Sequence, residues 1–116
     1  MKPVRSTLNV MAVLAGLGEL AMGVQFATAG GSGDVPAPAF IAGAGFLALA
    51  WFLSRSDKIW PAFGLAGLFL LELGPLPFLD RSSWMDWAVQ GGFGVLSLVG
   101  LCAAFADVVG RRRGIA

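Results

Sequence analysis

Histidine and tyrosine do not occur in this chain of 116 residues, and cysteine occurs only once. The absence of histidine removes the imidazole that most often binds metal ions and that serves as the base in Ser-His-Asp triads. The single cysteine, Cys102, excludes a disulfide within one chain. The glycines form no phosphate-binding loop motif. We therefore expect no catalytic residues, no metal and no cofactor, and the sequence favours a role other than that of an enzyme.

Charged residues are also scarce, at 13% of the chain, whereas hydrophobic residues make up 57%. A soluble domain carries about 25% charged residues. The mean hydropathy of +0.78 indicates the same class. Together these values predict an integral membrane protein whose outer surface faces the lipid bilayer, and no nucleic-acid partner is expected.

Four apolar segments follow one another with short connections between them. A helix needs about 20 apolar residues to cross a hydrocarbon layer of about 30 Å. Backbone polar groups in lipid have to be paired within their own segment, so each segment is predicted to be a helix. The prediction is a single all-α domain over 1–116, an integral membrane bundle of four transmembrane helices at about 8–29, 37–53, 59–79 and 84–109.

The basic residues divide unevenly between the two sides of the predicted bundle. Four crossings place both chain ends on one side, and seven of the eight basic residues lie on that side, the exception being Arg81. Basic residues are retained on the cytoplasmic side of a membrane. Both termini are therefore predicted to be cytoplasmic, in a multi-pass protein of the prokaryotic plasma (inner) membrane.

The four tryptophans fall near the predicted ends of the helices. Trp51 and Trp60 lie on the cytoplasmic side, and Trp84 and Trp87 lie on the outer side. Tryptophan is enriched at both membrane–water interfaces, so these residues are expected to anchor the bundle in the bilayer.

Glu19 and Glu72 are the only acids well inside the predicted hydrocarbon layer. A carboxylate at the bilayer centre costs about 2.5–3.5 kcal/mol on insertion scales, and such residues face a bundle interior, a cavity or a partner. At about 1.5 Å per residue, both acids lie roughly 17 Å from the cytoplasmic edge. Their common depth predicts one acidic site near the midplane.

Other polar or irregular features extend this site toward the outer surface. Gln25 and Gln90 fall in the outer half of the first and fourth helices, and we expect them to join the acids in binding a ligand or proton. Pro75 cannot donate to the carbonyl of Leu71, so a kink is expected beside Glu72. The alternative is that Pro75 only ends the third helix.

Small residues recur at helical spacing and predict close packing between helices. Asp107 continues one of these rows and is expected to pair with Arg111, one turn away. The rows are Ala12, Gly16, Glu19 and Gly23 in the first helix, Ala39, Gly43, Ala44 and Ala48 in the second, and Ser97, Gly100, Ala104 and Asp107 in the fourth.

A resemblance to a known family lies in residues 18–23, which read GELAMG. This segment resembles the Glu-Leu-x-x-Gly segment of DoxX-like four-helix membrane proteins, where it falls in a later helix. The resemblance implies a four-helix membrane fold. The length, the four spans and the acid in the first span are also similar to small multidrug resistance transporters, which surround that acid with tyrosine and tryptophan. Because this chain has no tyrosine, the DoxX-like resemblance is preferred.

The paired acids lead to a functional hypothesis. Low dielectric favours the neutral form of a carboxyl group, and two neighbouring carboxyls retain a proton that an entering cation displaces. We expect a binding or transport unit with a midplane acidic pocket for proton-coupled handling of a small cationic or amphipathic solute. Two alternatives remain open: a non-catalytic accessory subunit of a larger membrane complex, and an acid pair with a structural role alone. The expected partners are the lipid bilayer and either further copies of the chain or a larger membrane complex.

Overall fold

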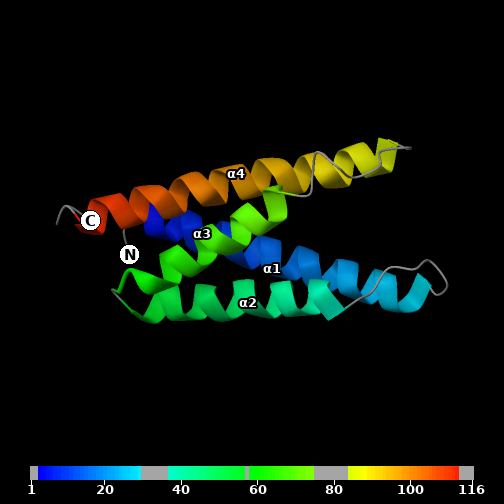
Figure 1. Cartoon of the computed structure of the whole chain (residues 1–116), viewed down its shortest axis with the longest axis horizontal. Helices are drawn as coiled ribbons and strands as arrows, with labels where there is room; N and C mark the ends of the chain where they lie inside the picture. Colours follow the sequence, from blue (N-terminus) through cyan, green and yellow to red (C-terminus); the bar gives the residue numbers. More distant parts are fainter. Residues whose placement is uncertain (1–2, 30–36, 57, 75–83, 113–116) are drawn as a thin grey trace.

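The computed structural model describes residues 3–29, 37–56, 58–74 and 84–112. These residues form helices only, as predicted for an all-α protein (Figure 1). In chain order the four helices of the described residues are α1 (Pro3–Ala29), α2 (Ala37–Arg55), α3 (Trp60–Leu73) and α4 (Trp84–Arg112).

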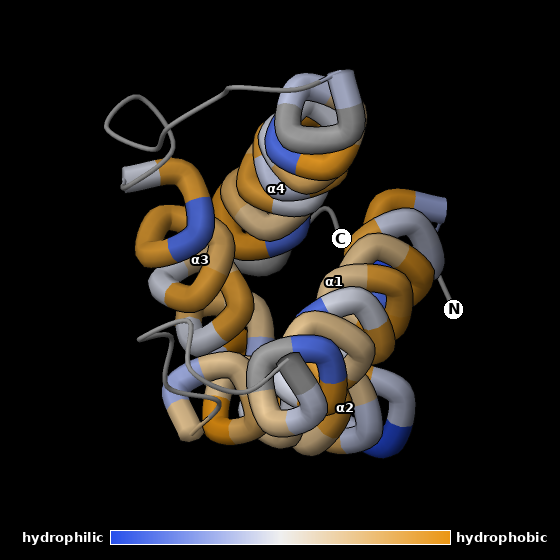
Figure 2. Tube along the Cα trace, turned by 90° about the vertical axis from the view of Figure 1, so that its right-hand side faces the viewer, coloured by the Kyte–Doolittle hydropathy of each residue, from blue (hydrophilic) through white to orange (hydrophobic). Residues whose placement is uncertain are grey.

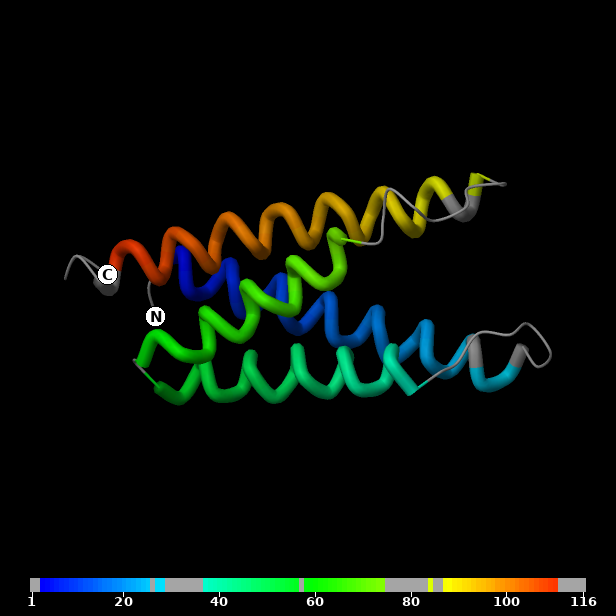
Figure 3. The backbone as a smooth tube through the Cα atoms, viewed as in Figure 1, coloured from blue at the N-terminus to red at the C-terminus, as the bar shows by residue number. Residues whose placement is uncertain are grey.

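The helices form an elongated bundle of 51 × 22 × 17 Å in which consecutive helices run in opposite directions (Figure 1). α1 packs against α2 and α4, and α3 packs against the same two helices. Figure 2 shows the resulting ring, with α1 and α3 facing each other diagonally. α1 begins and α4 ends at the same end of the bundle, which we call the terminal end (Figure 3).

Three helices within the described residues, α1, α2 and α4, are long and apolar enough to cross a membrane. The described part of α3 ends at Leu73 after 14 residues, and residues 75–79 of the expected helix at 59–79 lie outside the described residues. Fourteen residues span about 21 Å, which is less than the hydrocarbon layer. The expected kink at Pro75 lies outside the described residues.

The outer surface of the bundle carries many large apolar side chains. Ile41 is 72% exposed and Leu71 is 71% exposed, while Phe46, Phe69 and other apolar residues are fully buried. A soluble monomer rarely exposes contiguous apolar patches larger than a few hundred Å². The distribution therefore agrees with an environment that is apolar on the outside as well as in the core.

Glycines allow the helices to approach closely. A Cβ built on Gly16 of α1 would lie 3.1 Å from the carbonyl oxygen of Gly43 in α2, so these two backbones nearly touch. Gly100 of α4 is covered by the ring of Phe69 from α3. The predicted small-residue rows of α1 and α4 are buried, which confirms both. The row of α2 is wrong at Ala44 and Ala48, which are exposed because α2 presents Ala39, Gly43, Phe46 and Ala50 to the bundle instead.

A buried ion pair closes the terminal end. Arg5 of α1 is 2% exposed, and its Nη1 donates to Oδ2 of Asp107 in α4 at 2.8 Å. The guanidinium also donates from Nε to the carbonyl oxygen of Leu53 at the end of α2, and from Nη2 to those of Ser56 and Lys58. One side chain thus joins α1, α2, α4 and the connection before α3. We call this set of contacts around Arg5 the clamp. The expected partner of Asp107, Arg111, has a side chain outside the described part of the structure.

Gly100→Ala should destabilise the bundle by about 1–3 kcal/mol, because the added methyl group overlaps the buried ring of Phe69. Gly91→Ala on the same helix is the matched control, since a Cβ there meets nothing within 4 Å. The control should be neutral or stabilising by up to about 1 kcal/mol through helix propensity. Unfolding in mixed micelles measures both, and equal stability of the two variants would contradict the packing described.

Arg5→Leu should cost about 3–5 kcal/mol, because Asp107 is then left buried without its cation. The double variant Arg5→Leu with Asp107→Leu should recover much of this loss, since no uncompensated charge remains. Lys58→Leu is the control, because its exposed side chain takes no part in the clamp and only its carbonyl oxygen does. The measurement is the free energy of unfolding of the unaltered protein and of these three variants. An Arg5→Leu protein as stable as Lys58→Leu would contradict the clamp.

Candidate acidic site within the bundle

Glu19 points from α1 into the bundle and is 8% exposed. It continues the buried row of small residues formed by Ala12, Gly16 and Gly23. The neighbouring Gly18 is covered by the ring of Phe93 from α4, where an added Cβ would lie 2.7 Å from the ring. The close approach of α1 to its neighbours therefore holds the Glu19 carboxyl in the interior.

Glu72 approaches from the opposite side of the ring of helices. It lies three residues beyond the buried Phe69, on the last turn of α3, and is partly buried. The carboxyl groups of Glu72 and Glu19 lie close enough to interact with each other. α1 and α3 are diagonal in the bundle, so the two acids meet across its interior rather than along one helix–helix seam.

A hydrogen bond between two carboxyl groups requires a proton on one of them, because an ionised carboxylate only accepts. The Glu19–Glu72 pair can therefore be joined by a hydrogen bond when one of the two carboxyls carries a proton. Both groups lie inside an apolar bundle, where an unpaired charge is costly. The pair is consequently suited to exchange its proton for a cation.

Ser97 of α4 is a further polar group in the interior. It is 0% exposed, and its Oγ has no hydrogen-bond partner among the described residues. The contact of Gly100 with Phe69 fixes the antiparallel register of α3 and α4, which places Ser97 level with Glu72. The contact of Gly18 with Phe93 fixes the register of α1 and α4 in the same way. It places Glu19 about 7 Å from Ser97 along the bundle axis, in the direction away from the terminal end. Helical side chains lean toward the N-terminus of their helix, which brings the Glu19 carboxyl back toward the level of Ser97.

The other residues expected at this site are placed differently. Gln25 lies six residues beyond Glu19, and its side chain is exposed, so it does not join the pair. Gln90 is partly buried on α4, seven residues before Ser97, or about 10 Å along the helix. Pro75 lies outside the described residues. The structure thus brings together the two acids and leaves Gln25 apart from them.

Ser97 was grouped with the small residues of α4 by its sequence alone, and its role as a polar interior group was missed. Its position in the row that also carries Asp107 was the available signal, because a row with one polar end faces the interior. The described residues contain no group of three or more His, Cys, Asp or Glu side chains suited to a metal ion. The candidate site therefore consists of the two carboxyls, and the Ser97 hydroxyl is a further buried polar group that makes no hydrogen bond to either of them.

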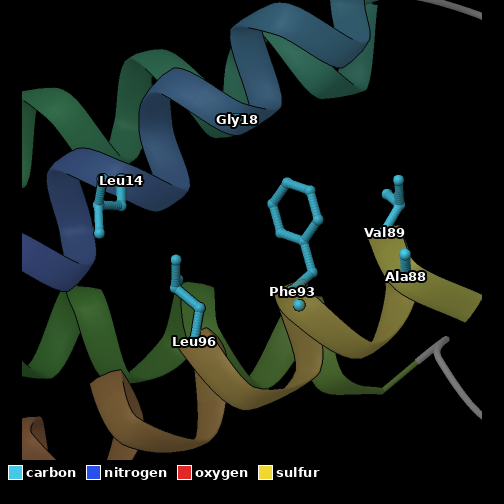
Figure 4. Close-up of a pocket in the computed structure, with 7 residues that line it drawn as sticks. Leu14, Gly18, Ala88, Val89, Phe93 and Leu96 are labelled. Atoms are coloured by element: carbon cyan, nitrogen blue, oxygen red, sulfur yellow. The ribbon is translucent and has the colours of Figure 1, made fainter.

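An apolar groove runs beside the pair, between α1 and α4 (Figure 4). Its volume is about 400 Å³. Figure 4 shows Phe93 projecting from α4 toward Gly18, with Leu14 and Leu96 on one side and Ala88 and Val89 on the other. The groove lies beside Glu19, because the preceding residue on α1, Gly18, is part of its lining.

Comparison with known proteins gives no relative from which a family or function follows. No protein-family model, curated protein or solved structure matches this chain.

Proposed function

We propose that the chain is a small integral membrane protein that binds a cationic or amphipathic solute at Glu19 and Glu72 and exchanges it for a proton. The observation that carries the proposal is the contact of two carboxyl groups from diagonal helices inside an apolar bundle. Buried ionisable groups in membrane helices are costly and mark ion, proton or ligand sites.

Insertion into a membrane is supported by the spacing of polar and aromatic groups along α4. Trp87 is exposed at one end, and Asp107 lies in the clamp at the other. The 20 residues between these positions span about 30 Å, which equals the hydrocarbon thickness of a bilayer. Exposed apolar side chains of α4 such as Val95, Leu98 and Phe105 lie between these levels and face the lipid in this proposal.

Aromatic and basic side chains at the terminal end support an interface there. The ring of Phe52 lies 5.1 Å from Trp51 and 5.0 Å from Trp60, and the guanidinium of Arg55 lies 5.1 Å above Trp51. All four side chains are exposed. Aromatic rings with basic groups are typical of the membrane–water boundary, and basic residues favour the cytoplasmic side. We therefore propose that the bundle crosses a bacterial-type inner membrane with both termini on its cytoplasmic side.

The exchange follows from charge balance within the pair. With one proton the pair carries a single negative charge. A monovalent cation that binds between two ionised carboxylates releases that proton to water, and the net charge of the site stays the same. Ser97 supplies an oxygen level with Glu72 that accepts a hydrogen bond from an ammonium group. A primary amine cation, with three donors, matches two carboxylates and one hydroxyl.

Reporter fusions should place both termini in the cytoplasm. Green fluorescent protein at the C-terminus should fluoresce, and alkaline phosphatase at the same position should be inactive. The reason is that seven of the eight basic residues lie on the side of the termini, and basic residues favour the cytoplasmic side of the membrane. Phosphatase fused after Ser82 should be active, since α3 then has to cross the membrane. An inactive Ser82 fusion would contradict the crossing by α3, and an active C-terminal fusion would contradict the orientation.

Glu19→Gln and Glu72→Gln should each abolish proton release when methylammonium is added to the protein in lipid nanodiscs. Either variant should weaken methylammonium binding roughly 10- to 150-fold, the effect of losing a charge-assisted hydrogen bond of about 1.5–3 kcal/mol. Calorimetry measures the affinity, and a pH indicator in weak buffer measures the proton.

Gln25→Ala is the control for this experiment, because Gln25 lies on α1 with an exposed side chain. It should bind methylammonium and release the proton as the unaltered protein does. Proton release that persists in both Gln variants at full affinity would contradict the exchange site.

A further inference from the structure

We infer that the groove between α1 and α4 binds the alkyl chain of an amphipathic amine whose ammonium group occupies the acid pair. The inference rests on the proposed function and adds the substrate class, a primary amine with an apolar chain. The groove is lined by Leu14, Gly18, Ala88, Val89, Gly92, Phe93 and Leu96.

The groove and the acidic site are separated by one residue on each helix. On α1, Gly18 lines the groove and the next residue, Glu19, is buried in the interior. On α4, Leu96 lines the groove and the next residue, Ser97, is buried in the interior. The seam between the two helices therefore has an apolar outer side and a polar inner side.

Phe93 stands at this seam. Its ring covers Gly18, the residue beside Glu19, and it also forms part of the groove wall (Figure 4). A rotation of this one ring opens the α1–α4 seam, because Gly18 has no side chain that keeps it closed. An amine entering from the apolar side then places its head group at the acids and its chain along the wall.

The chemistry of the groove selects for an alkyl chain. Every lining side chain is apolar, and the volume of about 400 Å³ lies within the range of small-molecule sites, about 300–1,000 Å³. Its lining includes Gly92, where an added Cβ meets nothing within 4 Å, so the wall leaves space at this point. A short amine reaches the acids without using this space, whereas an amine with a longer chain fills it.

The test compares octylammonium with methylammonium on variants that fill the groove. Gly92→Leu projects a side chain into the open space and should weaken octylammonium binding roughly tenfold, the loss expected when about two methylene groups are displaced from an apolar site. Methylammonium affinity and its proton release should not change. Gly91→Leu is the matched control, because Gly91 has the same open surroundings but does not line the groove.

Ala88→Leu provides a second variant, since Ala88 is exposed on the groove wall and tolerates a larger side chain. It should act in the same direction as Gly92→Leu, and thermal unfolding confirms that each protein is folded. Equal loss in Gly91→Leu and Gly92→Leu, or unchanged octylammonium affinity in both groove variants, would overturn the inference while methylammonium exchange stands. Absence of binding by either amine would overturn the inference and the proposed function together.

Discussion

A polar group enclosed by apolar helices has no water to bind, so it has to find its partner on another part of the protein. In this bundle the constraint is met at two levels. Near the terminal end Arg5 meets Asp107 and three backbone carbonyls, and further along the bundle Glu19 meets Glu72. Each of these contacts joins helices that are distant in the sequence, and together they fix how the four described helices are arranged.

The two contacts differ in chemistry, and the difference separates structure from function. The Arg5–Asp107 pair is complementary in charge and is surrounded by carbonyl acceptors, so it is stable without change of protonation. The Glu19–Glu72 pair consists of like groups, which attract each other only when one of them carries a proton. A contact that depends on a proton changes when a cation replaces that proton. A complementary ion pair contains no such proton and does not change in this way. This distinction is the physical basis for proposing the glutamates as the exchange site.

The sequence predicted much of the fold because each apolar run between two turn signals corresponds to one helix. α1, α2 and α4 lie close to their expected ranges, and the common depth of Glu19 and Glu72 indicated that they meet. The clamp was not predicted, because Arg5 and Asp107 are 102 residues apart and local spacing favoured Arg111 as the partner. Nor does helical periodicity show that the Ser97 hydroxyl has no hydrogen-bond partner among the described residues, since that depends on which side chains the neighbouring helices place around it.

The central claim is that the two carboxyls interact, and a double-mutant cycle on the free energy of unfolding tests it most directly. Glu19→Gln, Glu72→Gln and the double variant should show a coupling energy of about 0.5–3 kcal/mol, as residues in contact do. A parallel cycle of Gln25→Ala with Glu72→Gln should be additive within about 0.5 kcal/mol, because Gln25 is exposed and apart from the pair. Additive effects of Glu19→Gln and Glu72→Gln would contradict the account.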